Sequence, residues 1–216
     1  MKQWRVLSQL VKERVVAVIR GETPEQAEAA AAACYRGGIR TLEVTFTVPE
    51  AERVIGNLRR RFPEALIGAG TVLDAETARM AISAGASFVV SPHPEETLAR
   101  MCHRYQVPYL PGCMTVKEMV GALEWGCSIL KLFPGNAFGP AFLRSLKGPL
   151  PQAEFMPTGG VNVENVTDWL QSGAVAVGIG GELIRPAENG DFEEVERRAR
   201  ELMARVKTDR EEVGDV

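Results

Sequence analysis

Short aliphatic and β-branched runs alternate with longer amphipathic stretches along almost the whole of this 216-residue chain. The runs are apolar at nearly every position, which is typical of parallel strands covered by helices rather than of strands with one wet face. Each run is followed by a stretch with helical periodicity, so the order predicts repeated β/α units. Eight runs fit this description, at residues 15–19, 41–45, 66–70, 88–91, 107–111, 129–133, 154–157 and 174–179.

The stretches between the runs predict helices that begin at polar or proline positions. Thr23, for example, is a suitable N-cap, and Pro24 suits the first helical position after it. The predicted helices cover residues 24–36, 49–61, 74–84, 94–105, 115–125, 140–146, 163–172 and 192–206.

The two ends of the chain carry features outside this repeat. Residues 1–13 predict an extra amphipathic helix, and its apolar stripe is expected to consist of Trp4, Leu7, Leu10 and Val11. The acidic residues 208–216 predict a frayed tail.

The count of eight units favours a closed (β/α)8 TIM barrel over an open, doubly wound sheet. Small residues recur at strand ends that would crowd a barrel mouth, at Gly68, Gly70, Gly178 and Gly180. The length of the chain fits one such barrel, so a single domain is expected over residues 1–216.

Composition excludes several classes of function. The net charge of −3 gives no support for a nucleic-acid surface, and no apolar stretch is long enough to span a bilayer. Charges interrupt the N-terminal segment, unlike a signal peptide, so the cytoplasm is the expected compartment and the four cysteines are expected to be buried free thiols. His93 and His103 are the only histidines, which is too few for an imidazole-rich metal site, and no metal is expected.

The carboxyl ends of the strands are where a barrel of this kind carries its active site. Lys131 stands out there because it interrupts an apolar run with Ile129 and Phe133 on its own face. Burial disfavours the ammonium form, and a neutral lysine amine is a nucleophile that forms imines with ketones. A structural ion pair, or a side chain extended to solvent, is the alternative interpretation of this lysine.

Glu43 is the matching acidic candidate. Alternation places it on one strand face with Thr41 and Thr45, and this polar face is expected to point into the barrel. A carboxylate beside an inward lysine suits proton transfer, although a purely structural pair with Lys131 explains the same placement.

Two glycine pairs predict an anion site at the last two strand ends. Gly159–Gly160 and Gly180–Gly181 leave main-chain N–H groups accessible, and the loops after strands 7 and 8 are the recurrent phosphate site of barrels. Tight turns alone would also explain these glycines.

Arg20 and Thr71 are further candidates at the barrel mouth. Arg20 follows the first strand and suits a carboxylate or a phosphate, unless it is only an exposed loop residue. Thr71 offers a hydroxyl group and is also placed to cap the next helix.

Motifs at seven strand ends together resemble the family of 2-keto-3-deoxy-6-phosphogluconate (KDPG) and 4-hydroxy-2-oxoglutarate (KHG) aldolases, over about residues 10–185. The motifs are Val-Ile-Arg-Gly (18–21), Leu-Glu-Val-Thr-Phe-Thr (42–47), Ile-Gly-Ala-Gly-Thr-Val (67–72), Val-Ser-Pro-His (90–93), Leu-Pro-Gly-Cys-Met-Thr (110–115), Leu-Lys-Leu-Phe-Pro (130–134) and Pro-Thr-Gly-Gly-Val (157–161).

The resemblance implies a role for each matching residue. It makes Lys131 the Schiff-base lysine and Glu43 the catalytic glutamate, and it puts phosphate on the two glycine pairs. It also implies a homotrimer and no cofactor. The substrate-binding residues that it implies are Arg20, Thr47, Thr71, Pro92, Phe133 and Thr158.

Two departures from the family pattern concern substrate binding. Some members carry an arginine at the position that matches Thr47, so Arg20 is expected to do that work alone. A serine that many members have in the final loop is matched here to Gly181, which removes one hydroxyl donor.

The expected function is therefore class I cleavage of KDPG to pyruvate and glyceraldehyde 3-phosphate, with KHG cleavage to pyruvate and glyoxylate beside it. The same chemistry on 2-keto-3-deoxy-6-phosphogalactonate is one alternative. A phosphosugar isomerase or phosphate-binding barrel without lyase activity is another, and such a protein would have no need of an amine in an apolar strand.

Overall fold

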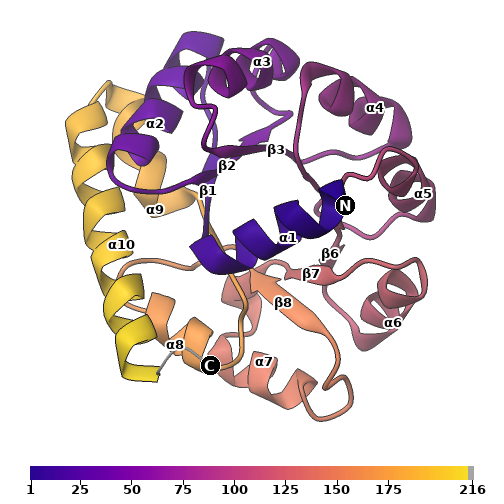
Figure 1. The fold of residues 1–216 in the computed structure, drawn as a ribbon. Coiled ribbons are helices and arrows are strands. Elements are labelled where there is room, and N and C mark those ends of the chain that lie inside the picture. The colour runs from indigo at the N-terminus through magenta and orange to yellow at the C-terminus, as the bar shows by residue number, and fades with distance from the viewer. Residues whose placement is uncertain (214–216) are drawn as a thin grey trace.

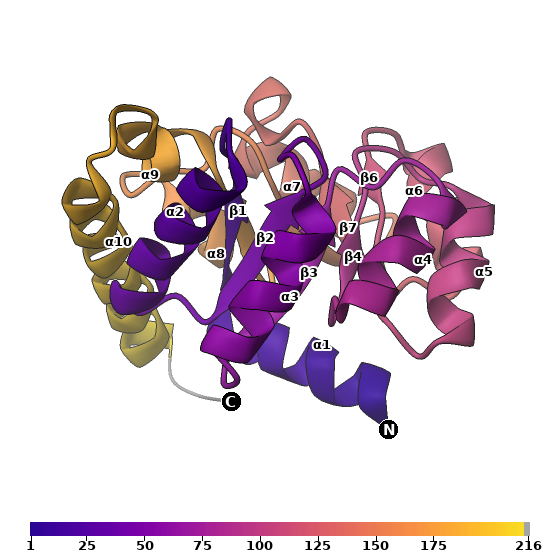
Figure 2. The same ribbon diagram turned by 90° about the horizontal axis from the view of Figure 1, so that it is seen from above.

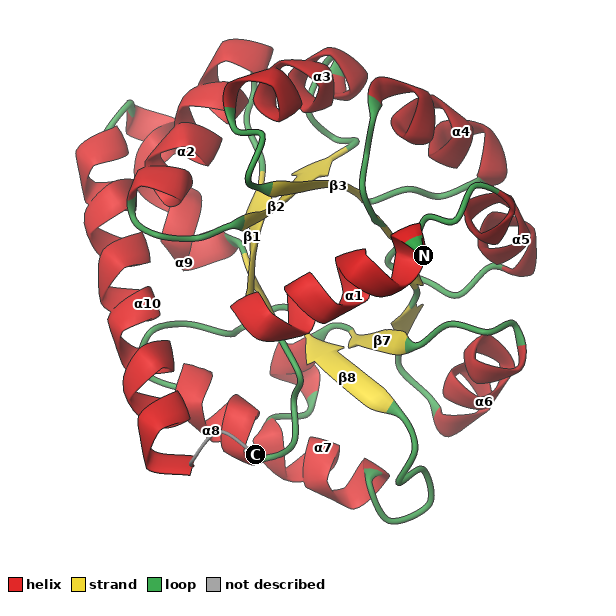
Figure 3. Cartoon of the chain, viewed as in Figure 1, coloured by secondary structure: helices red, strands yellow, loops and turns green. Residues whose placement is uncertain are grey.

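Parallel strands surrounded by helices form the computed structural model, which describes residues 1–213 of the chain (Figures 1 and 3). The strands are β1 (Val15–Ile19), β2 (Thr41–Thr45), β3 (Leu66–Gly70), β4 (Val89–Val90), β5 (Tyr109–Leu110), β6 (Gly112–Cys113), β7 (Ile129–Leu132), β8 (Glu154–Pro157) and β9 (Val177–Ile179). All of the paired strands run parallel to each other.

Helices lie outside the strands, except for α1, which crosses one end of them (Figures 1 and 2). The α-helices are α1 (Lys2–Glu13), α2 (Pro24–Arg36), α3 (Ala51–Arg61), α4 (Ala75–Ala84), α5 (Glu96–Arg104), α6 (Val116–Glu124), α7 (Pro140–Leu146), α8 (Val166–Gln171), α9 (Gly181–Ile184) and α10 (Phe192–Val213). Two short 3-10 helices, η1 (Gly135–Ala137) and η2 (Arg185–Asn189), complete the elements. Thr23 caps α2 as predicted, accepting a hydrogen bond from the Gln26 N–H.

The strands form two sheets and not the single closed eight-stranded sheet predicted from the sequence. Six strands pair in the order β5-β4-β3-β2-β1-β9, and three pair in the order β6-β7-β8. The predicted strand at 107–111 is split at Pro111, which has no N–H to donate to a ladder. At the other junction, β8 and β9 meet only through the isolated bridges Phe155–Ala174 and Thr158–Gly178.

The core has two parts because most of the strands bury apolar side chains on both faces. One part lies between strands and outer helices and includes Leu42, Val44, Leu130 and Leu132. The other part lies among the strands themselves and is covered by α1. It consists of Val6, Leu10, Val16, Leu66, Phe88, Val90, Leu110, Ile129, Met156 and Ala176.

Helix α1 confirms the predicted N-terminal helix but only half of its predicted apolar stripe, since Leu7 and Leu10 pack against the inner core while Trp4 and Val11 do not. Leu10 is buried in the inner core, whereas Trp4 is 64% exposed and Val11 is 41% exposed. Val6, absent from the prediction, is buried instead. The helix lies obliquely over the amino ends of the strands, so its contact face depends on the strands beneath it and not only on its own periodicity.

The expected frayed tail is wrong for residues 208–213, because α10 continues to Val213. Asp209 is buried there and forms an ion pair with Arg14 at 3.0 Å. It also accepts a hydrogen bond from Gln171 at 3.1 Å. These contacts tie the end of α10 to α8 and to the segment between α1 and β1. Residues 214–216 lie outside the described part.

The four cysteines are free and buried, as the composition predicts. No helix between residues 1 and 213 has the length and apolar character needed to cross a membrane.

Candidate active site

Lys131 lies in β7 and points into the space among the strands. Ile129, two residues before it on the same face, belongs to the inner core, whereas Leu130 and Leu132 face the helices. The lysine side chain is only 5% exposed, and its Nζ lies 4.7 Å from the centre of the Phe133 ring. Burial lowers the pKa of Lys131 below its ordinary value; the charge of Arg20 lowers it further, while that of Glu43 opposes the change.

Glu43 lies in β2 on the inward face predicted for it, with Thr41 and Thr45 on the same side and all three buried. Burial raises the pKa of this carboxyl above its ordinary value, and the charges of Lys131 and Arg20 oppose the increase. Neither oxygen of Glu43 has a hydrogen-bond partner among the described residues. A buried carboxyl without a protein partner is rare, and this marks Glu43 as a candidate functional group.

Glycine in β3 makes the room for this carboxyl. A Cβ atom on Gly70 would lie 2.0 Å from Oε1 of Glu43 and 2.6 Å from its Cδ. Gly68, two residues earlier on the same strand face, leaves room for the Phe88 ring, because a Cβ there would lie 2.3 Å from that ring. The glycines of this strand therefore have separate roles, one at the carboxyl and one in the core.

Arg20 and Thr47 are both exposed at strand ends on the side of the lysine and the glutamate. Arg20 directly follows β1, and its charge acts on both Glu43 and Lys131. The Thr47 hydroxyl lies 2.7 Å from that of Thr45, which also contacts the Ile19 carbonyl at 3.1 Å. The buried Thr45 hydroxyl thus holds the Thr47 side chain in position at the end of the strand.

Thr71 has a left-handed backbone, with a φ of 56°. Branching at Cβ makes this conformation costly for threonine, and such strain is concentrated at functional positions. The alternative that Thr71 caps the next helix is wrong, because Asp74 caps α4 by accepting from the Thr77 N–H. Its half-buried hydroxyl is therefore not used for helix capping.

Pro92 follows β4 on a segment that is held by hydrogen bonds from buried hydroxyl groups. The Ser91 hydroxyl is buried and lies 2.6 Å from the Tyr109 hydroxyl, and both contact the carbonyl of His93. Gly112 packs so closely that a Cβ there would lie 2.5 Å from the Pro92 carbonyl carbon. The half-buried proline is thereby fixed next to the start of β6.

The first glycine pair forms a turn with left-handed backbone, φ being 94° at Gly159 and 74° at Gly160. Their N–H groups find no acceptor in the described part of the chain. Asn165 holds the turn by donating to the Gly160 carbonyl at 2.8 Å, and a Cβ on Gly160 would lie 2.6 Å from Cβ of Asn136. These features leave the two N–H groups available to an anion.

The second pair, Gly180–Gly181, lies at the junction of β9 and α9. A Cβ on Gly181 would meet no atom within 4 Å, so this residue borders open space. The Thr158–Gly178 bridge connects the two glycine loops, and Gly178 leaves room for the Thr158 hydroxyl, which a Cβ would approach to 2.2 Å. Thr158 itself is 6% exposed.

Some residues that shape the site were missed. Ser91 and Tyr109 act through a buried hydroxyl contact between neighbouring strands, for which the sequence offers no periodic signal. Asn136 lies in η1 against the Gly159–Gly160 turn, and its place just after the lysine strand was the available signal. Among the described residues, no group of three His, Cys, Asp or Glu side chains is suited to hold a metal ion.

Comparisons with known proteins find relatives that match most of the chain. A family model described as KDPG and KHG aldolase matches residues 6–198. The chain is 37% identical over 194 residues to the 2-dehydro-3-deoxy-phosphogluconate aldolase of Treponema pallidum, which covers 88% of this chain and 92% of that protein. It is 34% identical over 213 residues to the 2-dehydro-3-deoxy-6-phosphogalactonate aldolase of Escherichia coli, with 98% and 99% covered.

A solved structure of the KDPG aldolase from Legionella pneumophila, with pyruvate captured as a covalent carbinolamine intermediate, is similar in fold as well. The TM-score is 0.81 at 32% identity, with 88% of this chain and 93% of that chain covered.

Proposed function

The chain belongs to the KDPG and KHG aldolase family, and we propose that it is a Schiff-base aldolase whose nucleophile is the amine of Lys131. The observation that carries this proposal is the buried combination of Lys131 and Glu43. Burial shifts the pKa of each group toward its neutral form, downward for the amine and upward for the carboxyl. A neutral amine beside a protonated acid is the pair that imine formation requires.

The reaction begins with attack of the Lys131 amine on the C2 ketone of a 2-keto-3-deoxy sugar acid. A C–N bond forms as the π bond of the carbonyl breaks, and a proton passes from the attacking nitrogen to the former carbonyl oxygen, which becomes a hydroxyl. Glu43 then gives its proton to this hydroxyl, which leaves as water while the nitrogen lone pair forms the C=N bond. The resulting iminium withdraws electrons from C3.

In the cleavage step Glu43 is deprotonated, because it has given its proton to the departing water. As a carboxylate it removes the proton of the C4 hydroxyl, directly or through a water molecule. The C3–C4 bond breaks, C4 becomes an aldehyde carbon, and the electron pair of the bond forms an enamine. Protonation of the enamine at C3 and hydrolysis of the imine release pyruvate and restore the lysine.

Two anion sites support the binding of such a substrate. Arg20 and the strained Thr71 suit the carboxylate end, with Thr47 nearby. The N–H groups of Gly159, Gly160 and Gly181 suit a phosphate at the other end. Pro92, Phe133 and Thr158 are proposed to line the space between these ends.

The proposed substrate is KDPG, cleaved to pyruvate and glyceraldehyde 3-phosphate, with KHG cleaved to pyruvate and glyoxylate beside it. The similarity to a phosphogalactonate aldolase over 98% of the chain supports the C4 epimer as a second candidate. Steady-state turnover of KDPG, its galactonate epimer and KHG, measured in parallel, decides among them.

Trapping with borohydride tests the mechanism. Incubation with pyruvate and borohydride is expected to add a reduced pyruvate adduct to Lys131, located by peptide mass. Lys131→Ala should abolish the adduct. Lys147→Ala is the matched control, since Lys147 also lies near an aromatic ring but is partly exposed. An unmodified wild-type protein, or an adduct that survives Lys131→Ala, would contradict the proposal.

We also propose that the two sheets act as one (β/α)8 barrel forming a single domain, that the enzyme is a cytoplasmic homotrimer, and that it needs no cofactor. The continuous chain through Pro111 and the bridges between β8 and β9 support the barrel. Exposed apolar side chains support self-association, namely Leu73, Met80, Met114, Val116 and Val120. Light scattering of the purified protein tests the trimer.

A further inference from the structure

Helix α9 begins within the second glycine pair, so the position of the helix and that of the pair are linked. The helix has four residues, Gly181–Ile184, and is too short to be stable without tertiary contacts. Leu183 and Ile184 anchor it because both are buried in the core between the strands and the outer helices. A cavity lined by α9, η2 and α10 separates part of the helix from α10. The place of the glycine pair therefore depends on the polar contacts that α9 makes as well.

One main-chain carbonyl of α9 lacks its usual helical partner. Helical geometry pairs the carbonyl of residue 182 with the N–H of residue 186. Residue 186 is a proline, which has no N–H to donate. The preceding carbonyl, on Gly181, does accept from the Arg185 N–H. The Glu182 carbonyl therefore depends on a donor from outside the helix.

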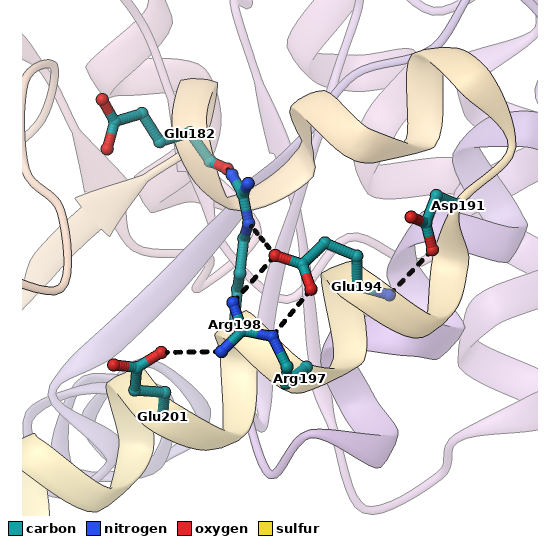
Figure 4. A network of polar contacts seen from close by, with 6 residues as sticks. All are labelled: Glu182, Asp191, Glu194, Arg197, Arg198 and Glu201. Carbon is teal, nitrogen blue, oxygen red and sulfur yellow. Dashed lines mark hydrogen bonds and ion pairs between the residues drawn. The ribbon is translucent and has the colours of Figure 1, made fainter.

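Arg198 of α10 supplies this donor, as Figure 4 shows. Its Nη1 donates to the main-chain carbonyl of Glu182, which is 16 positions away in the sequence. A hydrogen bond from a charged donor is stronger than one between neutral groups. Since Glu182 directly follows Gly181, the contact ties the second glycine pair to the long helix α10.

Glu194 orients Arg198 for this contact. Its carboxylate accepts from Nε of Arg198 at 2.8 Å, which leaves Nη1 for the Glu182 carbonyl. Arg197 donates to both oxygens of the same carboxylate, at 2.7 and 2.8 Å, and pairs with Glu201 at 3.1 Å. The hydrogen bonds from Arg197 and Arg198 lower the pKa of Glu194 to about 2, so this carboxylate stays charged and continues to hold Arg198.

The ionisable side chains of residues 182 and 185 do not make this connection. Arg185 directly follows α9, is exposed and lines the same cavity, but its side chain makes no hydrogen bond or ion pair within residues 1–213. The Glu182 carboxylate points away from the network. Arg198 is therefore the arginine whose removal would loosen α9.

We infer that Arg198 is a positioning residue for phosphate binding, because its contact with the Glu182 carbonyl fixes the place of Gly180–Gly181. The inference rests on the proposed function for the identity of the phosphate site. Main-chain donors stabilise an anion best when they are held in place before it binds. A looser α9 would thus weaken phosphate binding, while the chemistry at Lys131 would continue.

The test compares Arg198→Gln with Arg200→Gln. The control removes the same charge from the same helix, at a residue that pairs with Glu196. Arg198→Gln is expected to raise KM for KDPG about 2- to 30-fold, the range for residues that act through others, with kcat little changed. The pyruvate concentration for half-maximal labelling of Lys131 should stay the same, since pyruvate has no phosphate. Arg200→Gln should change none of these values.

A second substitution separates the contact with the carbonyl from the charge of Arg198. Pro186→Ala gives residue 186 an N–H that can pair with the Glu182 carbonyl. The double variant Arg198→Gln/Pro186→Ala should therefore recover most of the lost affinity for KDPG, although it still lacks the charge. If KM stays as high as in Arg198→Gln, loss of the charge explains the effect and the inference is overturned.

A binding measurement separates failure of this inference from failure of the proposed function. Titration calorimetry with inorganic phosphate needs no turnover, and Arg198→Gln should weaken phosphate binding by about the same factor. An unchanged phosphate affinity and an unchanged KM for KDPG would overturn the role of Arg198, even in a protein that forms the Lys131 adduct. If the wild-type protein forms no adduct, the proposed function fails, whereas the phosphate titration still reports on Arg198.

Discussion

Replacing each inward glycine of β3 by alanine should separate the active site from the core beneath it. Gly68 and Gly70 are two residues apart, so both lie on the same strand face. A Cβ on Gly70 would lie 2.0 Å from Oε1 of Glu43, and one on Gly68 would lie 2.3 Å from the Phe88 ring. Real Cβ atoms do not tolerate either distance, and therefore the neighbour must move in both variants.

The two neighbours differ in how they can move. The Glu43 carboxyl is the end of a flexible side chain, so Gly70→Ala should displace it at a modest cost in stability. The Phe88 ring is rigid and fully buried, so Gly68→Ala should overpack the core and cost about 1–3 kcal/mol. For a protein of this size that is a fall in Tm of roughly 2–12 °C.

The loss of activity should be larger in Gly70→Ala than in Gly68→Ala, the reverse of the order expected for the loss of stability. Displacing a general acid–base group removes about 10²–10⁴-fold from the rate. Gly70→Ala is expected to lose kcat in that range, while Gly68→Ala keeps kcat close to the wild-type value at a temperature where it is folded.

The assay is pyruvate release from KDPG, measured per mole of folded enzyme, with thermal unfolding followed by circular dichroism. Retention of kcat by Gly70→Ala would refute the assigned role of the Glu43 carboxyl. A loss of kcat in Gly68→Ala as large as that in Gly70→Ala would refute the separation of site and core.

Three further predictions concern protonation and packing. Labelling by pyruvate and borohydride should persist at pH values well below 10.5 and should decline as pH falls through the lowered pKa of Lys131, since protonation removes the nucleophile; a midpoint at the ordinary lysine value would contradict this. Asp209→Asn should cost about 1–3 kcal/mol in urea unfolding, because the Arg14 guanidinium then loses its charged partner at a buried position. Leu10→Ala should cost about 2–5 kcal/mol, whereas Trp4→Ala should change stability by less than about 0.5 kcal/mol; equal losses would contradict the observed contact face of α1.

The strands near the glutamate were predictable to the residue. Both β2 and β3 begin and end where the sequence indicates, at residues 41–45 and 66–70. Both strands are buried throughout, so local pattern and tertiary burial agree. The same agreement makes the inward direction of Glu43 and Lys131 predictable, because the pleat alternates strictly and one face of each strand already faces the helices.

Other elements depended on contacts that no local pattern records. Helix α1 lies obliquely on the strands, so that Val6 is buried against the inner core and Trp4 is exposed. The end of α10 is ordered by the buried Asp209, whose partner Arg14 is distant in sequence. An acidic segment read in isolation favours fraying, whereas here Arg14 and Gln171 both hold Asp209 in place.

Catalysis and specificity therefore differ in how far a sequence can predict them. Lys131 and Glu43 lie within strands, where main-chain pairing restricts each side chain to one of two directions. Thr71 lies just after a strand, where the direction of the side chain depends on a left-handed φ that no alternating pattern predicts. The same chemistry can thus persist while loop residues change the substrate, so mechanism should be tested by substitutions in the strands and substrate choice by substitutions at the strand ends.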